Sequence, residues 1–242
     1  MCTVTFLPRR AGYWLAMNRD ERLTRPVALP PQQAEAGDRT VLCPAEPGGG
    51  TWIALNDQGI CLSLINWYSA PQYLARDVVS RGRVVPSACA ADTRHHVESV
   101  LRKLPLSRMN PFRLIGVFPT SSEVVEWRWG RGELHRLCHG WQVRQWTSSG
   151  FDDLAAQRVR RERWREALGQ RSAGTSAWLR RLHRSHAPQR GPFSVCMHRA
   201  DAATVSFTEI CVAPQCAAMR YWPGSPCCAR RSSSRELSNV NV

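Results

Sequence analysis

The start of the chain predicts a β-hairpin, and that hairpin restricts what the remaining residues can build around it. Residues 3–8 alternate and are rich in β-branched and aromatic side chains, and residues 13–18 follow after an Arg-Arg-Ala-Gly turn. Antiparallel pairing would bring Cys2, at the start of the first strand, beside Asn18, Arg19 and Asp20 at the end of the second. A thiol, an amide, a guanidinium and a carboxylate are therefore expected to meet at one end of a sheet.

Short strands dominate the rest of the pattern, with a few helices between them. The further strands are expected at residues 51–55, 60–66, 112–118, 123–129, 134–138, 143–147, 193–198, 204–212 and 217–222. The helices are expected at residues 92–104, 152–168 and 177–183. Residues 23–50 are rich in proline and contain a Gly-Gly-Gly run, so they are expected to form loops. This order favours a layered α+β domain, for which two antiparallel sheets packed face to face with helices outside is one solution.

The expected domain covers residues 1–226. The chain has 242 residues, of which 43% are hydrophobic and 21% are charged, values that are ordinary for one globular domain. Beyond Pro226 the sequence is rich in arginine and serine and has little apolar content. Residues 227–242 are therefore expected to be a disordered basic tail.

The net charge of +14 comes almost entirely from arginine, since Lys103 is the one lysine of the chain. Arginines gather at residues 158–171, 180–184 and 230–231, where they could attract anionic ligands. Arginine used simply as a solvated cation is the competing interpretation. No recognised nucleic-acid-binding module accompanies the charge, so we do not expect nucleic acid as the partner.

The ten cysteines do not form a recognisable framework. There is no CxxC pair, and neither Cys211-x4-Cys216 nor Cys227-Cys228 matches a closed zinc site. The segment after Met1 has no basic start and no long apolar run, so we expect neither a secretory signal nor a membrane anchor. We therefore expect a reduced protein of the bacterial cytoplasm, without a metal site or a cofactor.

Three motifs in order resemble the NRDE family: Met-Cys-Thr-Val-Thr at residues 1–5, Asn-Arg-Asp-Glu at 18–21 and Gly-Gly-Thr-Trp at 49–52. The similarity continues through the first 85 residues and returns at residues 199–206. This family, whose eukaryotic member is known as transport and Golgi organisation protein 2, is similar to the N-terminal-nucleophile amidohydrolases, which include choloylglycine hydrolases and penicillin V acylases. The resemblance implies a four-layer αββα sandwich of two antiparallel sheets, removal of Met1, and Cys2 as the nucleophile.

The chemistry of an N-terminal cysteine explains why these residue types belong together. A thiol attacks as its thiolate, and an α-amino group with a pKa of about 8 can accept the thiol proton. Asp20 could hold the α-ammonium group, and Arg19 could lower the thiol pKa or bind a substrate carboxylate. Asn18 is the third candidate in this segment. A surface turn with solvated charges is the alternative interpretation of residues 18–21.

The resemblance adds site residues from later in the chain. Asn66 is a candidate donor to the developing oxyanion, by analogy with an asparagine of the amidohydrolases. Ser148 and Ser149 stand where those enzymes carry a second asparagine, and with Trp52 they are candidates for substrate binding. Arg199 matches an arginine that lies close to the nucleophile in the relatives, although a solvent-facing arginine at a strand end fits equally well.

Two functions follow from the resemblance. The first is an N-terminal cysteine amidohydrolase that acts on a small, anionic amide or acyl compound through a Cys2 acyl-enzyme. The second is a non-catalytic carrier or chaperone on the same fold that handles haem, acyl-CoA or lipid. The expected partner is a small molecule rather than a membrane or a nucleic acid, and assembly as a homo-oligomer is left open.

Overall fold

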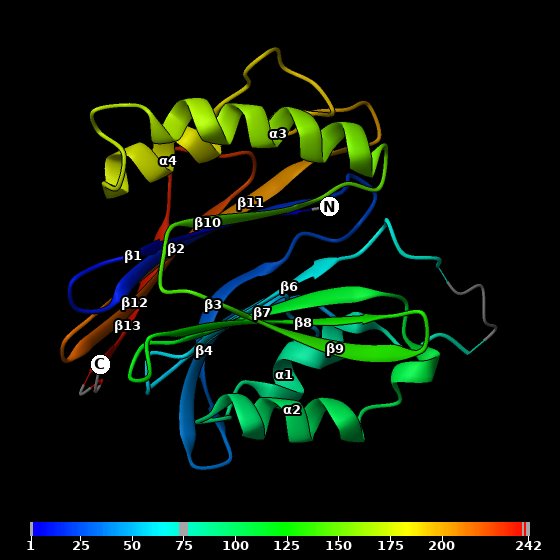
Figure 1. Cartoon of the computed structure of the whole chain (residues 1–242), viewed down its shortest axis with the longest axis vertical. Helices are drawn as coiled ribbons and strands as arrows, with labels where there is room; N and C mark the ends of the chain where they lie inside the picture. Colours follow the sequence, from blue (N-terminus) through cyan, green and yellow to red (C-terminus); the bar gives the residue numbers. More distant parts are fainter. Residues whose placement is uncertain (1, 73–76, 239, 241–242) are drawn as a thin grey trace.

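A computed structural model describes residues 2–72, 77–238 and 240. Two antiparallel sheets lie face to face, with helices on their outer surfaces (Figure 1). In spatial order, the first sheet contains β10 (Arg144–Ser148), β1 (Cys2–Pro8), β2 (Tyr13–Arg22), β11 (Ala202–Ala213), β12 (Cys216–Pro223) and β13 (Ser233–Ser238). The second contains β3 (Leu29–Ala36), β4 (Arg39–Ala45), β5 (Ile53–Asn56), β6 (Cys61–Asn66), β7 (Phe112–Phe118), β8 (Glu123–Gly130) and β9 (Glu133–His139).

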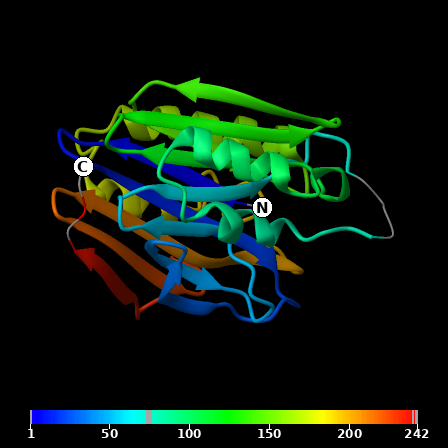
Figure 2. The same ribbon diagram turned by 90° about the horizontal axis from the view of Figure 1, so that it is seen from below.

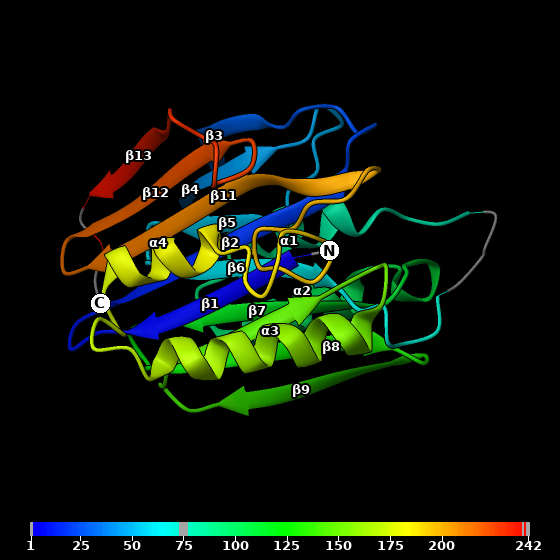
Figure 3. The same ribbon diagram turned by 90° about the horizontal axis from the view of Figure 1, so that it is seen from above.

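The helices complete the four layers. Helices α3 (Asp153–Leu168) and α4 (Ser176–Arg184) cover the outer face of the first sheet (Figure 3). Helices α1 (Val84–Ala88) and α2 (Arg94–Lys103) cover the outer face of the second sheet (Figure 2). The expected αββα sandwich is confirmed. No helix in the described part of the chain is long and apolar enough to cross a membrane.

The first hairpin is confirmed and forms the middle of its sheet. Strands β1 and β2 pair so that Cys2 lies opposite Arg19 and Thr3 lies opposite Asn18. Alternate side chains of a strand point to opposite faces. Accordingly Val4 packs into the core between the two sheets, whereas Thr3 faces the helical layer and accepts a hydrogen bond from a side chain of α3. Both faces of β1 are buried, which is why its sequence is apolar or weakly polar throughout.

Two expectations were wrong because edge strands carry little apolar signal. Residues 23–50 were expected to be loops, but they include β3 and β4 at the edge of the second sheet. Residues 227–242 were expected to be disordered, but β13 pairs with β12 and buries Leu237. Both outer strands are mostly exposed. Their conformation is set by pairing with a neighbour rather than by their own composition.

Two further expectations failed in the second half of the chain. Residues 143–147 were expected to continue a meander, but β10 crosses to the first sheet and pairs with β1 instead of β9. Residues 193–198 were expected to be a strand, but they form turns, with one isolated bridge between His198 and Ala203. A short, buried apolar run does not distinguish a strand from a packed turn.

Glu126 on β8 contacts β10 across the space between the two sheets. Burial alone would raise the pKa of Glu126, but hydrogen bonds from His139 and Arg128 and the charge of Arg113 lower it. The resulting carboxylate also accepts a 3.1 Å hydrogen bond from Nε1 of Trp146, which lies on β10. A charged carboxylate with several donors is a strong acceptor in a buried position. This contact helps to hold the end of β10 beside the start of β1.

Candidate active site

Cys2 lies at the end of the sandwich where a pocket opens between the two sheets. The strand register places it between Arg19 on β2 and Ser148 on β10. Residues in register share a face of the sheet, so all three side chains are directed toward the second sheet. Cys2 is buried, with 7% of its surface exposed.

The pocket beside Cys2 is small and polar. It has about 110 Å³ of space for the centres of water-sized molecules. Arg19 and Asp20 line it from the first sheet, and Trp52 and Asn66 line it from the second. Four of the residues that the sequence singled out, together with Cys2, are therefore brought together around one cavity.

Arg19 is held rigidly within this pocket. Its guanidinium pairs with Glu46, and its Nη2 lies 3.5 Å from a carboxylate oxygen of Glu21. The same guanidinium lies over the ring of Trp52, with Cζ 4.1 Å from the ring centroid. Ion pairing and stacking on an indole both fix the orientation of an arginine fork. Arg19 and Trp52 thus form one wall whose shape is set before any ligand binds.

Arg81 is a pocket residue that the sequence analysis did not select. It lines the cavity with Cys2 and donates a 2.9 Å hydrogen bond from Nη1 to the carbonyl of Pro111. Burial lowers the pKa of Arg81, whereas nearby Tyr68, Glu21 and Cys2 raise it. The sequence held a signal for it, since Ser80-Arg81-Gly82 belongs to the segment that resembles the NRDE family.

The surroundings of Cys2 favour the protonated thiol. Burial raises the pKa of Cys2, and the charge of Asp20 raises it further. The backbone N–H of Asp20 and the charge of Arg19 act in the opposite direction without reversing the shift. A thiol in this state is a weak nucleophile, so it must give its proton to a neighbouring base before it can attack.

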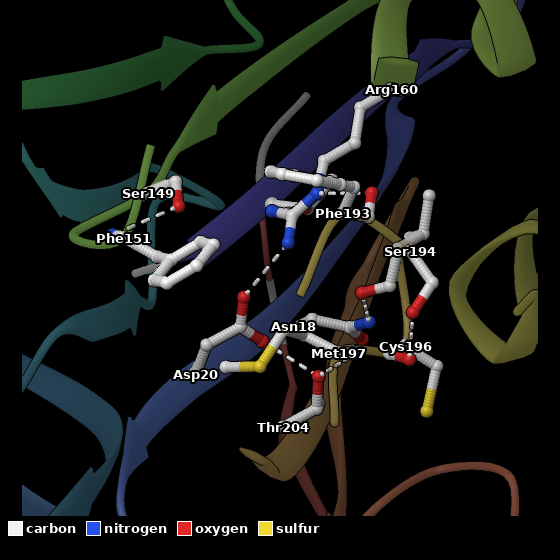
Figure 4. Close-up of polar contacts among 12 residues, drawn as sticks. Asn18, Asp20, Ser149, Phe151, Arg160, Phe193, Ser194, Cys196, Met197 and Thr204 are labelled. Atoms are coloured by element: carbon white, nitrogen blue, oxygen red, sulfur yellow. Dashed lines mark hydrogen bonds and ion pairs between the residues drawn. The ribbon is translucent and has the colours of Figure 1, made fainter. Parts of the chain in front are cut away.

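Two buried side chains bind the carboxylate of Asp20 (Figure 4). The hydroxyl of Thr204 donates to Oδ1 at 2.6 Å, and Nη2 of Arg160 lies 3.4 Å from Oδ2. Arg160 also donates to Oγ1 of Thr3 at 2.9 Å and to the carbonyl of Phe193 at 3.3 Å. The interpretation of arginines 158–171 as solvated cations is wrong for Arg160, which is fully buried. It holds the carboxylate beside Cys2.

Asn18 does not lie in the pocket, contrary to expectation. It lies opposite Thr3 in the hairpin, and its side chain, like that of Thr3, is directed toward the helical layer. Asp20 is on the same face, as its contacts with Arg160 and Thr204 show, but unlike Asn18 it still borders the pocket. Nδ2 of Asn18 donates to the carbonyls of His183 and Val195, both at 2.9 Å. Asn18 thus joins β2 to α4 and to the loop after it, and it positions the helical layer rather than a substrate.

His183, the partner of Asn18, makes folding sensitive to pH. Burial, with a smaller contribution from the charge of Arg160, lowers the pKa of His183 to about 3. Its Nδ1 donates to Oδ1 of Asn18 at 3.1 Å, and its Nε2 accepts from the hydroxyl of Thr5 at 2.9 Å, so the neutral ring is fully satisfied.

Below a pH of about 6.5 the unfolded chain binds a proton at His183 that the folded chain rejects. We therefore expect the contribution of His183 to the free energy of unfolding to be fully present above that pH and to be lost as the pH falls. Between pH 7 and pH 5 the loss from this residue should be about 2 kcal/mol. Urea unfolding at both values measures the difference. In the His183→Gln variant this part of the pH dependence should disappear. An unchanged slope would contradict the assignment.

Three further candidate residues, Asn66, Ser148 and Ser149, differ in whether they contact the pocket. Asn66 lines the pocket and donates from Nδ2 to the hydroxyl of Tyr68 at 2.8 Å. Ser148 is buried next to Cys2, and its hydroxyl has no hydrogen-bond partner within the described part of the chain. Ser149 is turned toward α3, where its backbone N–H donates to Asp153 at 2.8 Å. It therefore helps to begin the helix and does not line the pocket.

Arg199 is not at the pocket, contrary to expectation. Its Nη2 pairs with Asp201 at 2.7 Å, and its guanidinium lies over the ring of Phe151. Both partners are exposed. The similarity to the NRDE family at residues 199–206 identified the end of β11 that lies near the pocket, but it did not predict the direction of the Arg199 side chain.

One group of side chains could hold a metal ion, which the sequence analysis did not expect. The ligand atoms of His186, Cys196, His198 and Cys227 all lie within 4.8 Å of one another. Their spacing in the sequence matches no metal-binding motif, because three come from the loop before β11 and the fourth comes from the segment after β12. The Cys-x-His at residues 196–198 was the one local signal.

The comparisons agree with this architecture. The sequence model of the family described as Transport and Golgi organisation 2 matches residues 1–139. Among curated proteins, no sequence match was found. The fold is similar to that of penicillin V acylase from Agrobacterium tumefaciens, with a TM-score of 0.52, 13% identity, and coverage of 92% of this chain and 83% of that one. It is also similar to a mutant conjugated bile acid hydrolase from Clostridium perfringens, with a TM-score of 0.52, 7% identity and 98% coverage of both chains.

Proposed function

Since the chain belongs to the Transport and Golgi organisation 2 family, we propose that it is an amidohydrolase whose nucleophile is Cys2, acting on a small anionic amide or acyl compound. The observation that carries the proposal is the position of Cys2 in a polar pocket between Arg19 and Ser148, with Asp20 on its rim. The two solved structures of similar fold are named as an acylase and a hydrolase, which supports hydrolysis as the reaction class.

The proposed mechanism needs a base, because burial keeps the thiol protonated. Removal of Met1, which lies outside the described residues, would leave a free α-amine on Cys2 itself. That amine takes the thiol proton, and the sulfur then attacks the substrate carbonyl carbon. The C–N bond breaks as the ammonium returns the proton to the leaving nitrogen, which gives an amine product and a thioester on Cys2.

Hydrolysis of the thioester uses the same groups in reverse. The α-amine takes a proton from a water molecule, and the resulting hydroxide equivalent attacks the thioester carbonyl. The C–S bond breaks, the sulfur regains its proton from the ammonium, and a carboxylic acid leaves. In this mechanism Asp20 holds and orients the ammonium group, because a fixed carboxylate stabilises a cation formed beside it. Thr204 and Arg160 keep that carboxylate in place.

In this proposal, Asn66 and Ser148 donate to the oxyanion of the tetrahedral intermediate. The amide of Asn66 uses one N–H for Tyr68 and has a second to offer. The hydroxyl of Ser148 lies beside Cys2 without a partner in the described structure. A buried polar group without a partner is destabilising, so a donor that becomes satisfied only in the intermediate would favour catalysis.

The charges of the pocket support an anionic substrate. Arg19 is already paired with Glu46, and Arg25 is paired with Glu21 at 2.7 Å. Arg81 donates to a backbone carbonyl and keeps further N–H groups for a ligand. A guanidinium binds a carboxylate through two parallel hydrogen bonds, so Arg81 is the group that we expect to hold the substrate anion.

The proposal predicts the mass of the mature protein. Intact-mass measurement should give a chain that begins at Cys2, because the mechanism needs a free α-amine on the nucleophile. Exposure to an activated ester should then add one acyl group, which peptide mapping should place on Cys2. The control is the same protein with extra residues in front of Cys2, which should acylate slowly. Retention of Met1 in the native protein would rule out the mechanism and favour a ligand carrier on the same fold.

A further inference from the structure

Four metal-ligating side chains meet at a second site, outside the pocket just described. His186, Cys196 and His198 lie in the loop between α4 and β11, and Cys227 lies between β12 and β13. Among the described residues that line the Cys2 pocket, none belongs to this group. We propose that these four residues bind one Zn²⁺ ion in a closed tetrahedral site of two thiolates and two imidazoles.

The distances between the ligand atoms fit a shared zinc ion. With Zn–S of about 2.3 Å and Zn–N of about 2.0 Å, two tetrahedral nitrogens lie about 3.3 Å apart and a nitrogen and a sulfur about 3.5 Å apart. Nε2 of His198 lies 3.2 Å from Nε2 of His186. The same atom lies 3.5 Å from Sγ of Cys196 and 3.5 Å from Sγ of Cys227. All three separations agree with the geometry of atoms that coordinate one metal.

Hydrogen bonds alone do not account for this convergence. A ring nitrogen has either one proton to donate or one lone pair to accept with, so it can satisfy one partner at a time. Nε2 of His198 faces three partners at once, namely His186, Cys196 and Cys227. A cation at their centre would satisfy all four atoms together, because each can offer it a lone pair.

The ligand types also suit zinc. Binding would release the thiol protons, and the two thiolate charges would neutralise Zn²⁺. A set of two sulfurs and two nitrogens selects zinc over calcium or magnesium.

Arg190 is a neighbour that must adjust. Its Nη2 lies 3.3 Å from Nδ1 of His198. When Nε2 binds a metal, Nδ1 carries the ring proton and can no longer accept from a guanidinium. Arg190 is exposed and can turn into solvent. An Arg190→Ala variant should therefore keep its zinc.

The site would act as a structural clamp behind Asp20. Cys196 and His198 flank Met197, whose backbone N–H donates to Oγ1 of Thr204 at 2.8 Å (Figure 4). The hydroxyl of Thr204 in turn donates to Asp20. Four protein ligands leave no open coordination position, so the ion would fix this loop rather than take part in a reaction. The inference stands whether or not Cys2 is a nucleophile.

The test measures metal content directly. The full-length protein, purified without a metal-affinity step, should contain one zinc per chain when its metal content is measured by inductively coupled plasma mass spectrometry. After the zinc is replaced by Co²⁺, the spectrum should show the intense d–d bands of tetrahedral cobalt and thiolate-to-cobalt charge transfer. A chelator should lower the thermal unfolding midpoint of the wild-type protein.

The Cys227→Ser variant is the decisive one, because Cys227 is only partly buried and its replacement should leave the fold intact. Its zinc affinity should fall at least about tenfold, and the chelator should no longer shift its unfolding. Cys138→Ser is the matched control, since that exposed thiol lies on β9 of the other sheet. Unchanged zinc binding by Cys227→Ser would overturn the proposal. So would a disulfide between Cys196 and Cys227, or loss of zinc in Cys228→Ser instead.

Discussion

The Cys2→Ala variant is expected to form no acyl-enzyme and to lose turnover by at least about 10⁴-fold, because removal of a nucleophile leaves only binding and oxyanion stabilisation. The alanine methyl group occupies the position of the cysteine Cβ, so the shape of the pocket changes little. Stopped-flow acylation with an activated ester would measure the first step, and steady-state turnover would measure the cycle.

Cys61→Ala is the matched control for this experiment. Cys61 is fully buried in the same core between the two sheets, but its thiol faces Ser63 at 3.5 Å and does not line the pocket. Its replacement should lower stability by about 1–2 kcal/mol and leave the acylation rate of the folded protein unchanged. Equal acylation of Cys2→Ala and wild type would show that another residue is the nucleophile. Loss of acylation in both variants would show an effect of folding.

The first hairpin is the part of the fold that the sequence predicted most fully. Alternation and turn residues defined β1 and β2, and pairing then fixed the register that sets Cys2 opposite Arg19. The same reasoning failed for β3, β13 and β10, where the conformation depends on the neighbour. Strand β13 is polar and becomes a strand because β12 offers a free edge to it. Strand β10 leaves the meander to pair with β1, and the contact of Trp146 with Glu126 of the opposite sheet, which helps to hold it there, is distant in sequence.

The candidate site divides in the same way. Cys2, Arg19 and Asp20 stand in short motifs at one end of the hairpin, so local reasoning brought them together, whereas Trp52 was selected through the resemblance. Asn18 belongs to the same motif, yet its amide binds the carbonyls of His183 and Val195, and it does not line the pocket. The four residues of the proposed zinc site come from two separate segments, and apart from Cys-x-His at residues 196–198 the sequence spacing does not indicate that they meet.

The buried ion pair of Arg160 with Asp20 could not be predicted from the sequence. Arg160 stands among exposed arginines on α3, and composition gives no reason to separate it from them. The side chains of Arg160 and Asp20 are both 0% exposed, so their ion pair lies wholly outside water. In such a pair the attraction largely offsets the loss of hydration, and removal of one partner leaves the other charge uncompensated.

The Arg160→Met variant is therefore expected to lose about 3–5 kcal/mol of unfolding free energy, measured by urea titration at neutral pH. Methionine keeps most of the buried volume, so the loss reports on charge and hydrogen bonding rather than on a cavity. Arg158→Met changes the same residue type on the exposed side of the same helix and should stay within about 0.5 kcal/mol of wild type.

A second substitution separates the ion pair from the other contacts of Arg160. If the uncompensated charge of Asp20 causes most of the loss, Asp20→Asn in the Arg160→Met background should restore stability by about 1–2 kcal/mol, since an amide carries no charge to desolvate. No recovery would mean that the hydrogen bonds from Arg160 to Thr3 and to the Phe193 carbonyl carry the effect. In that case Arg160 would anchor α3 to β1, and the carboxylate beside Cys2 would depend chiefly on Thr204.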